Sequence, residues 1–205
     1  NALDYLENPL ENSSNSALNS GIKQQSLAGG LNYNRQWSLF LSSDIQVQSS
    51  NYKLDATNFS VDNNQKLLQQ NEVQDNGFTA KLKLDFNTRL NWVNGYQFSN
   101  VAIRNLEEVN NPSFRSNIKH ELITHSTFSE FSYSSQDQTT HLKAGARSNY
   151  FKSFDLLLVE PRLSFNQQFL THFKVEFLGE FKSQAASQVI DRQNDFLGIE
   201  KRRWV

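Results

Sequence analysis

The side chains that most often bind metals are few in this chain and poorly spaced for that role. The four histidines are His120, His125, His141 and His172. His120 and His125 are five residues apart, so on one regular strand they would point to opposite faces and make a poor ligand pair. His141 and His172 fall on the polar faces of two different predicted strands. We therefore interpret all four as solvated or lumen-lining side chains and predict no metal site and no cofactor.

Paired carboxylates are the next candidates for chemistry. Retaining glycosidases need two carboxyl groups about 5 Å apart. Glu107 and Glu108 are adjacent in a predicted loop, and Glu176 and Glu180 share the polar face of a predicted strand. Charge on a surface or in a lumen explains both pairs better than catalysis does. Serine is too abundant to single out a nucleophile, and no Gly-rich phosphate loop is present. The sequence therefore predicts that the protein is not an enzyme.

Composition excludes several further classes of protein. The 205 residues carry a formal net charge of -1, which gives no basic field for nucleic-acid binding. Cysteine is absent, and methionine is absent even at position 1, so we expect a mature product or a fragment. No apolar run approaches the roughly 20 residues of a membrane helix. A mean hydropathy of -0.63 does not argue against a membrane barrel, in which only every second residue faces lipid.

The most regular segment runs from Phe78 to Phe86 and reads F-T-A-K-L-K-L-D-F. Its even positions are apolar and its odd positions are polar. Side chains alternate between the two faces of a β-strand, so this segment has one apolar face and one polar face. Segments of this kind recur along the chain and predict its secondary structure.

The recurring pattern predicts an all-β fold, an antiparallel up-and-down meander of about eight long strands. Residues 1–16 are expected to be a loop or a weak strand, and residues 183–205 a long external loop leading to a missing strand. The segment 118–134 alternates poorly, so its faces cannot be assigned. The predicted strands cover residues 18–33, 37–56, 77–86, 89–105, 118–134, 139–151, 158–166 and 169–182.

Strand length and loop length together indicate a membrane barrel. A transmembrane strand needs about 9–11 residues, and most of the candidates reach that length. Tight turns alternate with longer polar gaps, of which 57–76 and 106–117 are the clearest. Outer-membrane barrels have short periplasmic turns and longer extracellular loops. We therefore predict that residues 1–205 form part of a transmembrane β-barrel.

Alternation in a barrel assigns candidate site residues to two environments. Aromatic side chains gather beside the tight turns, as in the aromatic girdles of outer-membrane barrels; the core of a soluble β protein would be the alternative explanation. Candidates for the lipid face or girdle are Trp37, Leu82, Leu84, Phe86, Trp92, Phe165 and Phe169. Candidates for the lumen are Lys81, Lys83, Asp85, His141, Lys143 and Arg147. No ligand-binding residue can be named among them.

Four short segments carry a resemblance to a known family. They are L-K-A-G-A-R-S-N-Y-F (142–151), E-P-R-L-S-F-N (160–166), G-E-F-K-S-Q (179–184) and D-F-L-G-I-E-K-R-R-W (195–204). In sequence and in order they resemble the barrel region of TonB-dependent outer-membrane receptors, most of all those of the Bacteroidetes. The resemblance is best from about residue 118 to 205.

The resemblance implies a 22-stranded barrel with an N-terminal plug in the outer membrane of a Gram-negative bacterium. Such receptors take up scarce nutrients, typically metal chelates, vitamins or glycans, with energy passed from TonB. The implied partners are outer-membrane lipid, the rest of the parent barrel and its plug, and the TonB complex, which would be contacted through the missing N-terminal part. This chain has too few strands, no plug and no TonB-contacting segment, so no substrate residue is carried over.

Two alternatives stay open. One is an outer-membrane barrel of another class, a porin or an adhesin-type barrel, which a plug sequence upstream in the gene would distinguish. The other is a soluble all-β ligand-binding domain, whose apolar strand faces would pack on each other instead of on lipid.

Overall fold

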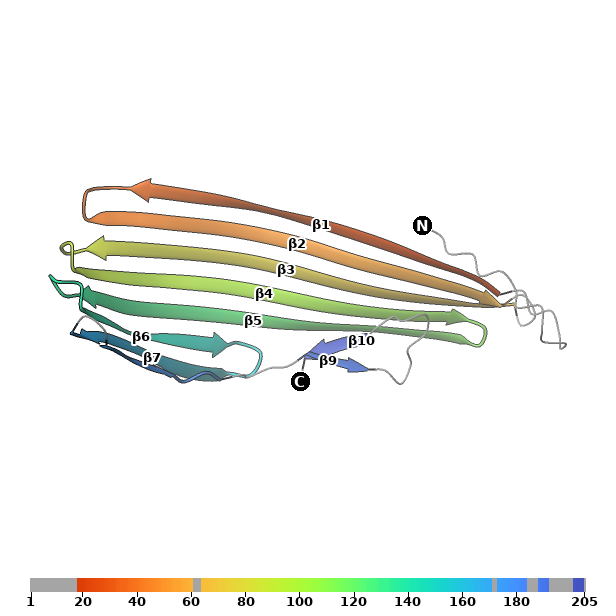
Figure 1. The fold of residues 1–205 in the computed structure, drawn as a ribbon. Helices are drawn as coiled ribbons and strands as arrows, with labels where there is room; N and C mark the ends of the chain where they lie inside the picture. Colours follow the sequence, from red (N-terminus) through yellow and green to blue (C-terminus); the bar gives the residue numbers. More distant parts are fainter. Residues whose placement is uncertain (1–17, 61–63, 171–172, 184–187, 192–200, 205) are drawn as a thin grey trace.

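Eight long strands pair in chain order to form one antiparallel sheet (Figure 1). The computed structural model describes residues 18–60, 64–170, 173–183, 188–191 and 201–204. The predicted up-and-down meander is confirmed, since each strand pairs with the next one along the chain. The strands are β1 (Leu18–Gln36), β2 (Leu41–Ser60), β3 (Gln65–Asp85), β4 (Leu90–Asn110), β5 (Ser113–Ser134), β6 (Thr140–Phe151), β7 (Leu156–Phe169) and β8 (Phe173–Glu180).

The sheet is open, with β1 and β8 as its edge strands. Two further short strands, β9 (Gln188–Asp191) and β10 (Lys201–Trp204), form a separate antiparallel pair. Part of the loop predicted for residues 183–205 is therefore strand, while residues 1–16 lie outside the described part of the chain. Nowhere in the described ranges is there a helix long and apolar enough to cross a membrane.

The long polar gaps predicted at residues 57–76 and 106–117 are wrong. β2 ends at Ser60 and β3 begins at Gln65, while β4 and β5 are separated only by residues 111 and 112. Both faces of these segments carry many polar side chains, so the alternation that marks a strand is lost there. Pairing with neighbouring strands holds them in the sheet all the same. Connections are thus short at both ends, and loop asymmetry no longer supports a barrel.

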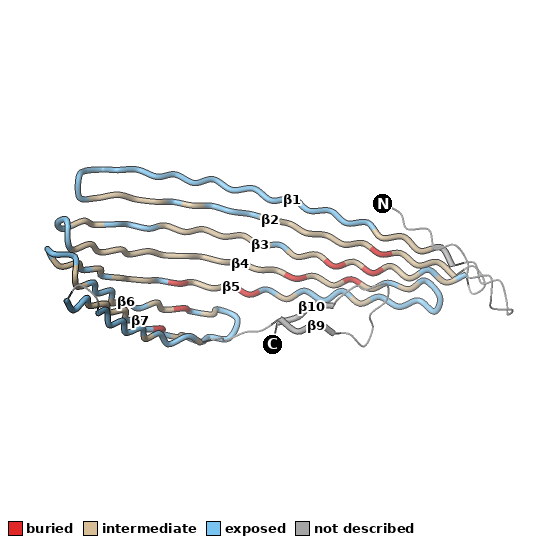
Figure 2. Tube along the Cα trace, viewed as in Figure 1, coloured by how far each residue is buried: buried red, intermediate tan, exposed pale blue. Residues whose placement is uncertain are grey.

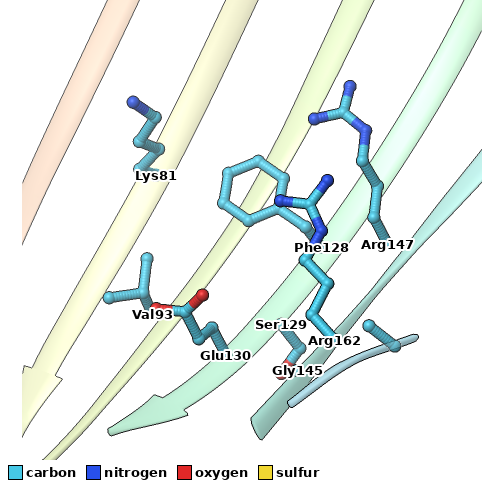
Figure 3. A pocket seen from close by; sticks show the side chains of 9 residues that line it. Lys81, Val93, Phe128, Ser129, Glu130, Gly145, Arg147 and Arg162 are labelled. Carbon is cyan, nitrogen blue, oxygen red and sulfur yellow. The ribbon is translucent and has the colours of Figure 1, made fainter. Parts of the chain in front are cut away.

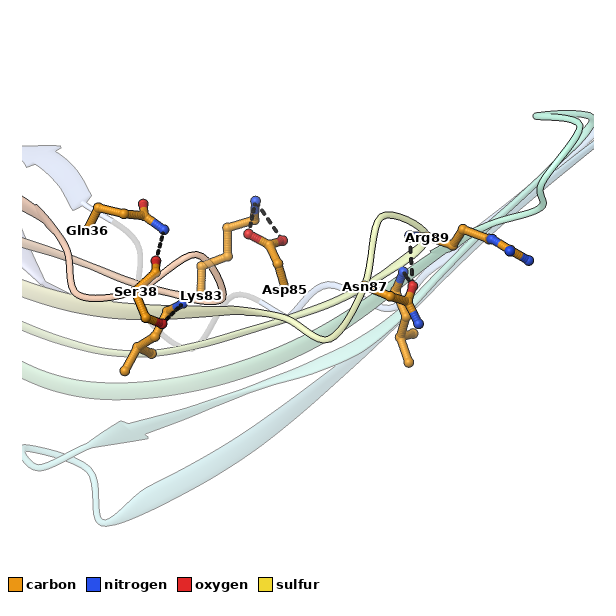
Figure 4. A network of polar contacts seen from close by, with 8 residues as sticks. Gln36, Ser38, Lys83, Asp85, Asn87 and Arg89 are labelled. Atoms are coloured by element: carbon orange, nitrogen blue, oxygen red, sulfur yellow. Dashed lines mark hydrogen bonds and ion pairs between the residues drawn. The ribbon is translucent and has the colours of Figure 1, made fainter.

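Short polar side chains fix the tight turns at one end of the sheet (Figure 4). The Ser38 hydroxyl accepts hydrogen bonds from the backbone N–H groups of Phe40 and Leu41, at 3.2 and 3.1 Å. Asn87 Oδ1 does the same for Arg89 and Leu90, at 2.8 and 2.9 Å. Side chains of Ser and Asn favour turns because they can replace backbone partners in this way.

The turn between β5 and β6 is organised around a carboxylate. Asp137 Oδ1 accepts a hydrogen bond from the Ser135 hydroxyl at 2.6 Å and one from the Thr139 backbone N–H at 3.3 Å. These donors favour the charged form, and the Ser135 hydroxyl contributes most to lowering the pKa of Asp137 below its usual value. The turn is therefore built around an ionised side chain.

An aromatic ring covers a glycine in the middle of the sheet. Gly95 in β4 lies directly opposite Phe128 in β5. A Cβ atom built on Gly95 would come within 2.1 Å of Phe128 Cζ, so the ring occupies the space that a side chain would fill. Aromatic side chains stabilise glycine positions in sheets by covering the bare backbone. The pair therefore needs glycine on one strand and a large ring on the other.

We predict that Gly95→Ala destabilises the protein by about 1–3 kcal/mol, because the new methyl group displaces the Phe128 ring. Gly29→Ala is the matched control, since nothing lies within 4 Å of a Cβ at Gly29. The free energy of unfolding from denaturant titration measures both. A double-mutant cycle with Phe128→Ala should reveal coupling between positions 95 and 128. Equal effects of the two glycine substitutions would contradict the contact.

Candidate functional site

The strand register assigns every side chain of the sheet to one of two faces. Residues directly opposite each other on antiparallel strands point to the same face. We call the side that carries Leu82 the Leu82 face and the other side the Lys81 face. Leu82 lies opposite Ser43 and Asn94, and Lys81 lies opposite Asp44 and Gly95, so each face can be traced from strand to strand.

The Leu82 face carries a mainly apolar band at the end of the sheet near Ser38 and Asn87, interrupted in the row of Leu82 by Ser43, Asn94 and Ser129. On β3 the band runs from Phe78 to Phe86, and on β4 from Leu90 to Phe98. Its members are exposed or half-buried, and none of them is fully buried. The exposed large side chains of this face include Leu31, Tyr33, Ile45, Val47, Leu82, Phe131, Tyr133, Leu142, Val159, Leu163, Phe173, Val175 and Phe177.

Aromatic rings occur at both limits of the band. Near the turns, Trp92 stacks between Phe86 and Phe131, with ring centroids 6.5 and 5.2 Å apart. Near the other limit, Tyr96 Oη and His125 Nδ1 share a hydrogen bond of 2.7 Å. The limit itself is a single row of opposed residues, formed by Val47, Phe78, Phe98, His125 and Tyr150.

Beyond that row the polarity of the two faces reverses. The Leu82 face continues with polar residues such as Asn76, Glu72 and Lys119, while the Lys81 face gains apolar residues such as Val73, Ile103 and Leu122 among its polar ones. Figure 2 shows buried positions scattered over this part of the sheet. In this part of the sheet Leu106 is buried on the Leu82 face, and the residues buried on the Lys81 face are Ala56, Gln69, Asn71, Ile103 and Leu122.

On the Lys81 face, directly behind the apolar band, the sheet carries a group of charged side chains, which we call the charged wall. Lys83 pairs with Asp85 at 2.9 Å, and Glu180 pairs with both Arg162 and Lys182, at 2.9 and 3.0 Å. These groups are partly exposed, so each pair stabilises the fold by at most about 1 kcal/mol. Their main effect is to make this part of the Lys81 face hydrophilic.

A buried polar network links three strands within this wall. Asn149 Oδ1 accepts hydrogen bonds from Ser126 Oγ at 2.7 Å and from Arg147 Nε at 2.9 Å. Arg147 Nη2 donates to Gln97 Oε1 at 2.7 Å. Glu160, beside Asn149, accepts from the backbone N–H and the hydroxyl of Ser183. The network therefore holds the Arg147 guanidinium in a defined orientation.

The candidates from the sequence divide between the faces as their alternation predicted. Whether the two faces meet lipid and a water-filled lumen stays a prediction. The Leu82 face holds Trp37, Leu82, Leu84, Phe86, Trp92, Phe165 and Phe169, of which Trp37 and Phe86 lie just beyond their strands. The Lys81 face holds Lys81, Lys83, Asp85, His141, Lys143 and Arg147.

The possible catalytic and metal-binding groups do not converge. His120 and His125 point to opposite faces of β5, as predicted, and His172 lies outside the described residues. Glu107 and Glu108 belong to β4 and not to a loop, so they too point to opposite faces. No group of three or more His, Asp or Glu side chains suited to a metal occurs in the described ranges.

Sequence reasoning missed Phe128, Gln97 and Ser126, whereas alternation along residues 139–151 does put Asn149 on the same polar face as Arg147. Phe128 lies in the poorly alternating segment 118–134, where only the register shows which way it points. Ser126, which donates to Asn149, and Gln97, which accepts from Arg147, come from other strands and become neighbours only through pairing. If the pairing of β4 with β5 had been known, Gly95 opposite an aromatic residue would have indicated the contact with Phe128.

Comparison with known proteins adds no relative: no family model, curated protein or solved structure matches this chain.

We predict that Asn149→Ala lowers stability by about 1–3 kcal/mol, because Arg147 and Ser126 lose their acceptor in a buried setting. Ser148→Ala is the matched control, since Ser148 is the next residue and points to the Leu82 face. Denaturant titration of both variants measures the difference. If Ser148→Ala costs as much as Asn149→Ala, the network has no special role.

Proposed function

We propose that this chain forms part of the wall of a transmembrane β-barrel in a bacterial outer membrane. The observation that carries the proposal is the exposed apolar band on the Leu82 face beside a charged wall on the Lys81 face. An exposed apolar surface of this extent marks a site that contacts another protein or a membrane. Lipid outside and water inside would suit the two faces.

The height of the band supports the same proposal. Nine residues, as from Phe78 to Phe86, rise roughly 30 Å along a strand. With the strand tilt of about 40° usual in barrels, this matches the apolar band of about 25 Å in outer-membrane proteins. Rings at both limits, Trp92 at one and Phe98 at the other, would lie at the two lipid–water boundaries as aromatic girdles do.

We further propose that the parent barrel is a receptor of the TonB-dependent type, which takes up a scarce nutrient. This step rests on the resemblance of the segments at 142–151, 160–166, 179–184 and 195–204. In that role the wall has no catalytic task and needs no cofactor. The Lys81 face would border the solute path and the plug, and TonB would act through another part of the parent protein.

The membrane proposal is tested by comparing Leu82→Arg with Lys83→Arg. A cation at the middle of a lipid-facing band costs about 2–4 kcal/mol, whereas a cation replacing a lumen lysine costs little. The free energy of unfolding is measured for the parent barrel refolded in lipid vesicles. On a water-exposed face Leu82→Arg would change stability by no more than about 0.5 kcal/mol, so equal effects would refute the assignment.

The receptor class is tested separately by the coding sequence upstream of residue 1. We expect it to encode a plug domain and a TonB-contacting segment behind a signal peptide. A barrel strand or a short leader directly upstream, with no plug, would favour a porin or an adhesin-type barrel and leave the membrane proposal intact.

A further inference from the structure

A hollow of about 350 Å³ lies on the Lys81 face at the depth of the apolar band. It spans β3 to β7 and is bordered by Lys81, Phe128, Glu130, Gly145, Arg147 and Arg162. This part of the lining requires glycine at position 145, because a Cβ there would meet the Ser129 carbonyl oxygen at 2.6 Å. The hollow is therefore set into the wall of the sheet.

Two cations border the hollow without a carboxylate partner. Neither Lys81 nor Arg147 forms an ion pair within 4.0 Å among the described residues, although Asp44 lies directly opposite Lys81 and Glu160 directly opposite Arg147 on the neighbouring strands. Arg162, in contrast, pairs with Glu180. One row of opposed residues runs from Lys81 through Gly95 and Phe128 to Arg147, so Phe128 is the only side chain between the two cations. In Figure 3 Lys81 lies on one side of the Phe128 ring and Arg147 on the other.

The arrangement is preorganised. Gln97 and Asn149 hold the Arg147 guanidinium, whose central carbon lies 6.0 Å from the centroid of the Phe128 ring. The Phe128 ring covers Gly95 and is also one of the residues that line the hollow. A guanidinium held in place loses little entropy when it binds an anion, and a flat ring offers a surface for stacking.

We propose that this hollow binds a small organic anion with a flat ring. The ring stacks on Phe128, and the carboxylates meet Lys81 on one side and Arg147 on the other. The inference deepens the proposed function by naming a class of solute, and it rests on that function to the extent that the anion is the solute taken up. Glu130 would repel a third negative group, which favours a linear dianion over a more highly charged one.

The test is calorimetric titration of the parent barrel, folded in detergent, with terephthalate as the probe. We expect binding that weakens about tenfold in Lys81→Gln and in Arg147→Gln, since each removes one charged hydrogen bond. Phe128→Leu should weaken binding about threefold to tenfold through lost stacking. Lys83→Gln is the control and should bind as the unchanged chain does, because Lys83 lies outside the hollow and pairs with Asp85.

Two further probes separate the classes of ligand. trans-Cyclohexane-1,4-dicarboxylate has the same charges without the flat ring, and inorganic phosphate has charge alone; both should bind more weakly than terephthalate. Equal binding of all three, or an unchanged affinity in Lys81→Gln, would overturn the proposal. So would binding of only a glutamate-rich peptide, which would point to an acidic protein segment as the occupant.

Lys81→Gln keeps this test independent of folding. Lys81 is exposed and makes no hydrogen bond or ion pair within the described part of the chain, so its replacement removes no structural contact. The outcome is also separable from the membrane proposal. Leu82→Arg probes the opposite face of the sheet, and its effect in vesicles stands whether or not terephthalate binds.

Discussion

The unbroken ladder of backbone pairing is the constraint on which the rest of this structure depends. The pairs between β1 and β2 run without interruption from Leu18 opposite Ser60 to Gln36 opposite Ser42, and the next three pairings are equally continuous. Few side chains are fully buried, Ile103 and Ser126 being the largest. With so little core, register decides which residues meet. A slip of one residue would send each side chain of a strand to the other face.

Register also turns separate sequence patterns into surfaces. Val47, Phe78 and Phe98 come from three strands, yet pairing sets them side by side at one limit of the apolar band. The same pairing brings Lys81, Phe128 and Arg147 into one row on the other face. Neither surface belongs to any single strand. An apolar band on one face and a charged wall on the other can therefore arise from strands whose composition, taken one strand at a time, indicates neither.

The sequence predicted those parts of the fold in which one strand carries its own evidence. Strict alternation from Phe78 to Phe86 was enough to place Leu82 and Lys83 on opposite faces. The polar halves of the strands, as at 65–76, could not be predicted because neither face is consistently apolar there. The Phe128–Gly95 contact and the Asn149 network could not be predicted either. They depend on the register between strands, which local patterns do not contain.

The reversal of polarity along the strands explains how one sheet can serve two surroundings. Near the turns at Ser38 and Asn87 its apolar side is exposed, and a stable protein needs something outside the chain to cover it. Farther along the strands, the apolar residues Ile103 and Leu122 lie on the Lys81 face and are buried, while most residues of the Leu82 face are polar. If lipid covers the band, the strands can continue into water beyond His125 without changing their pairing.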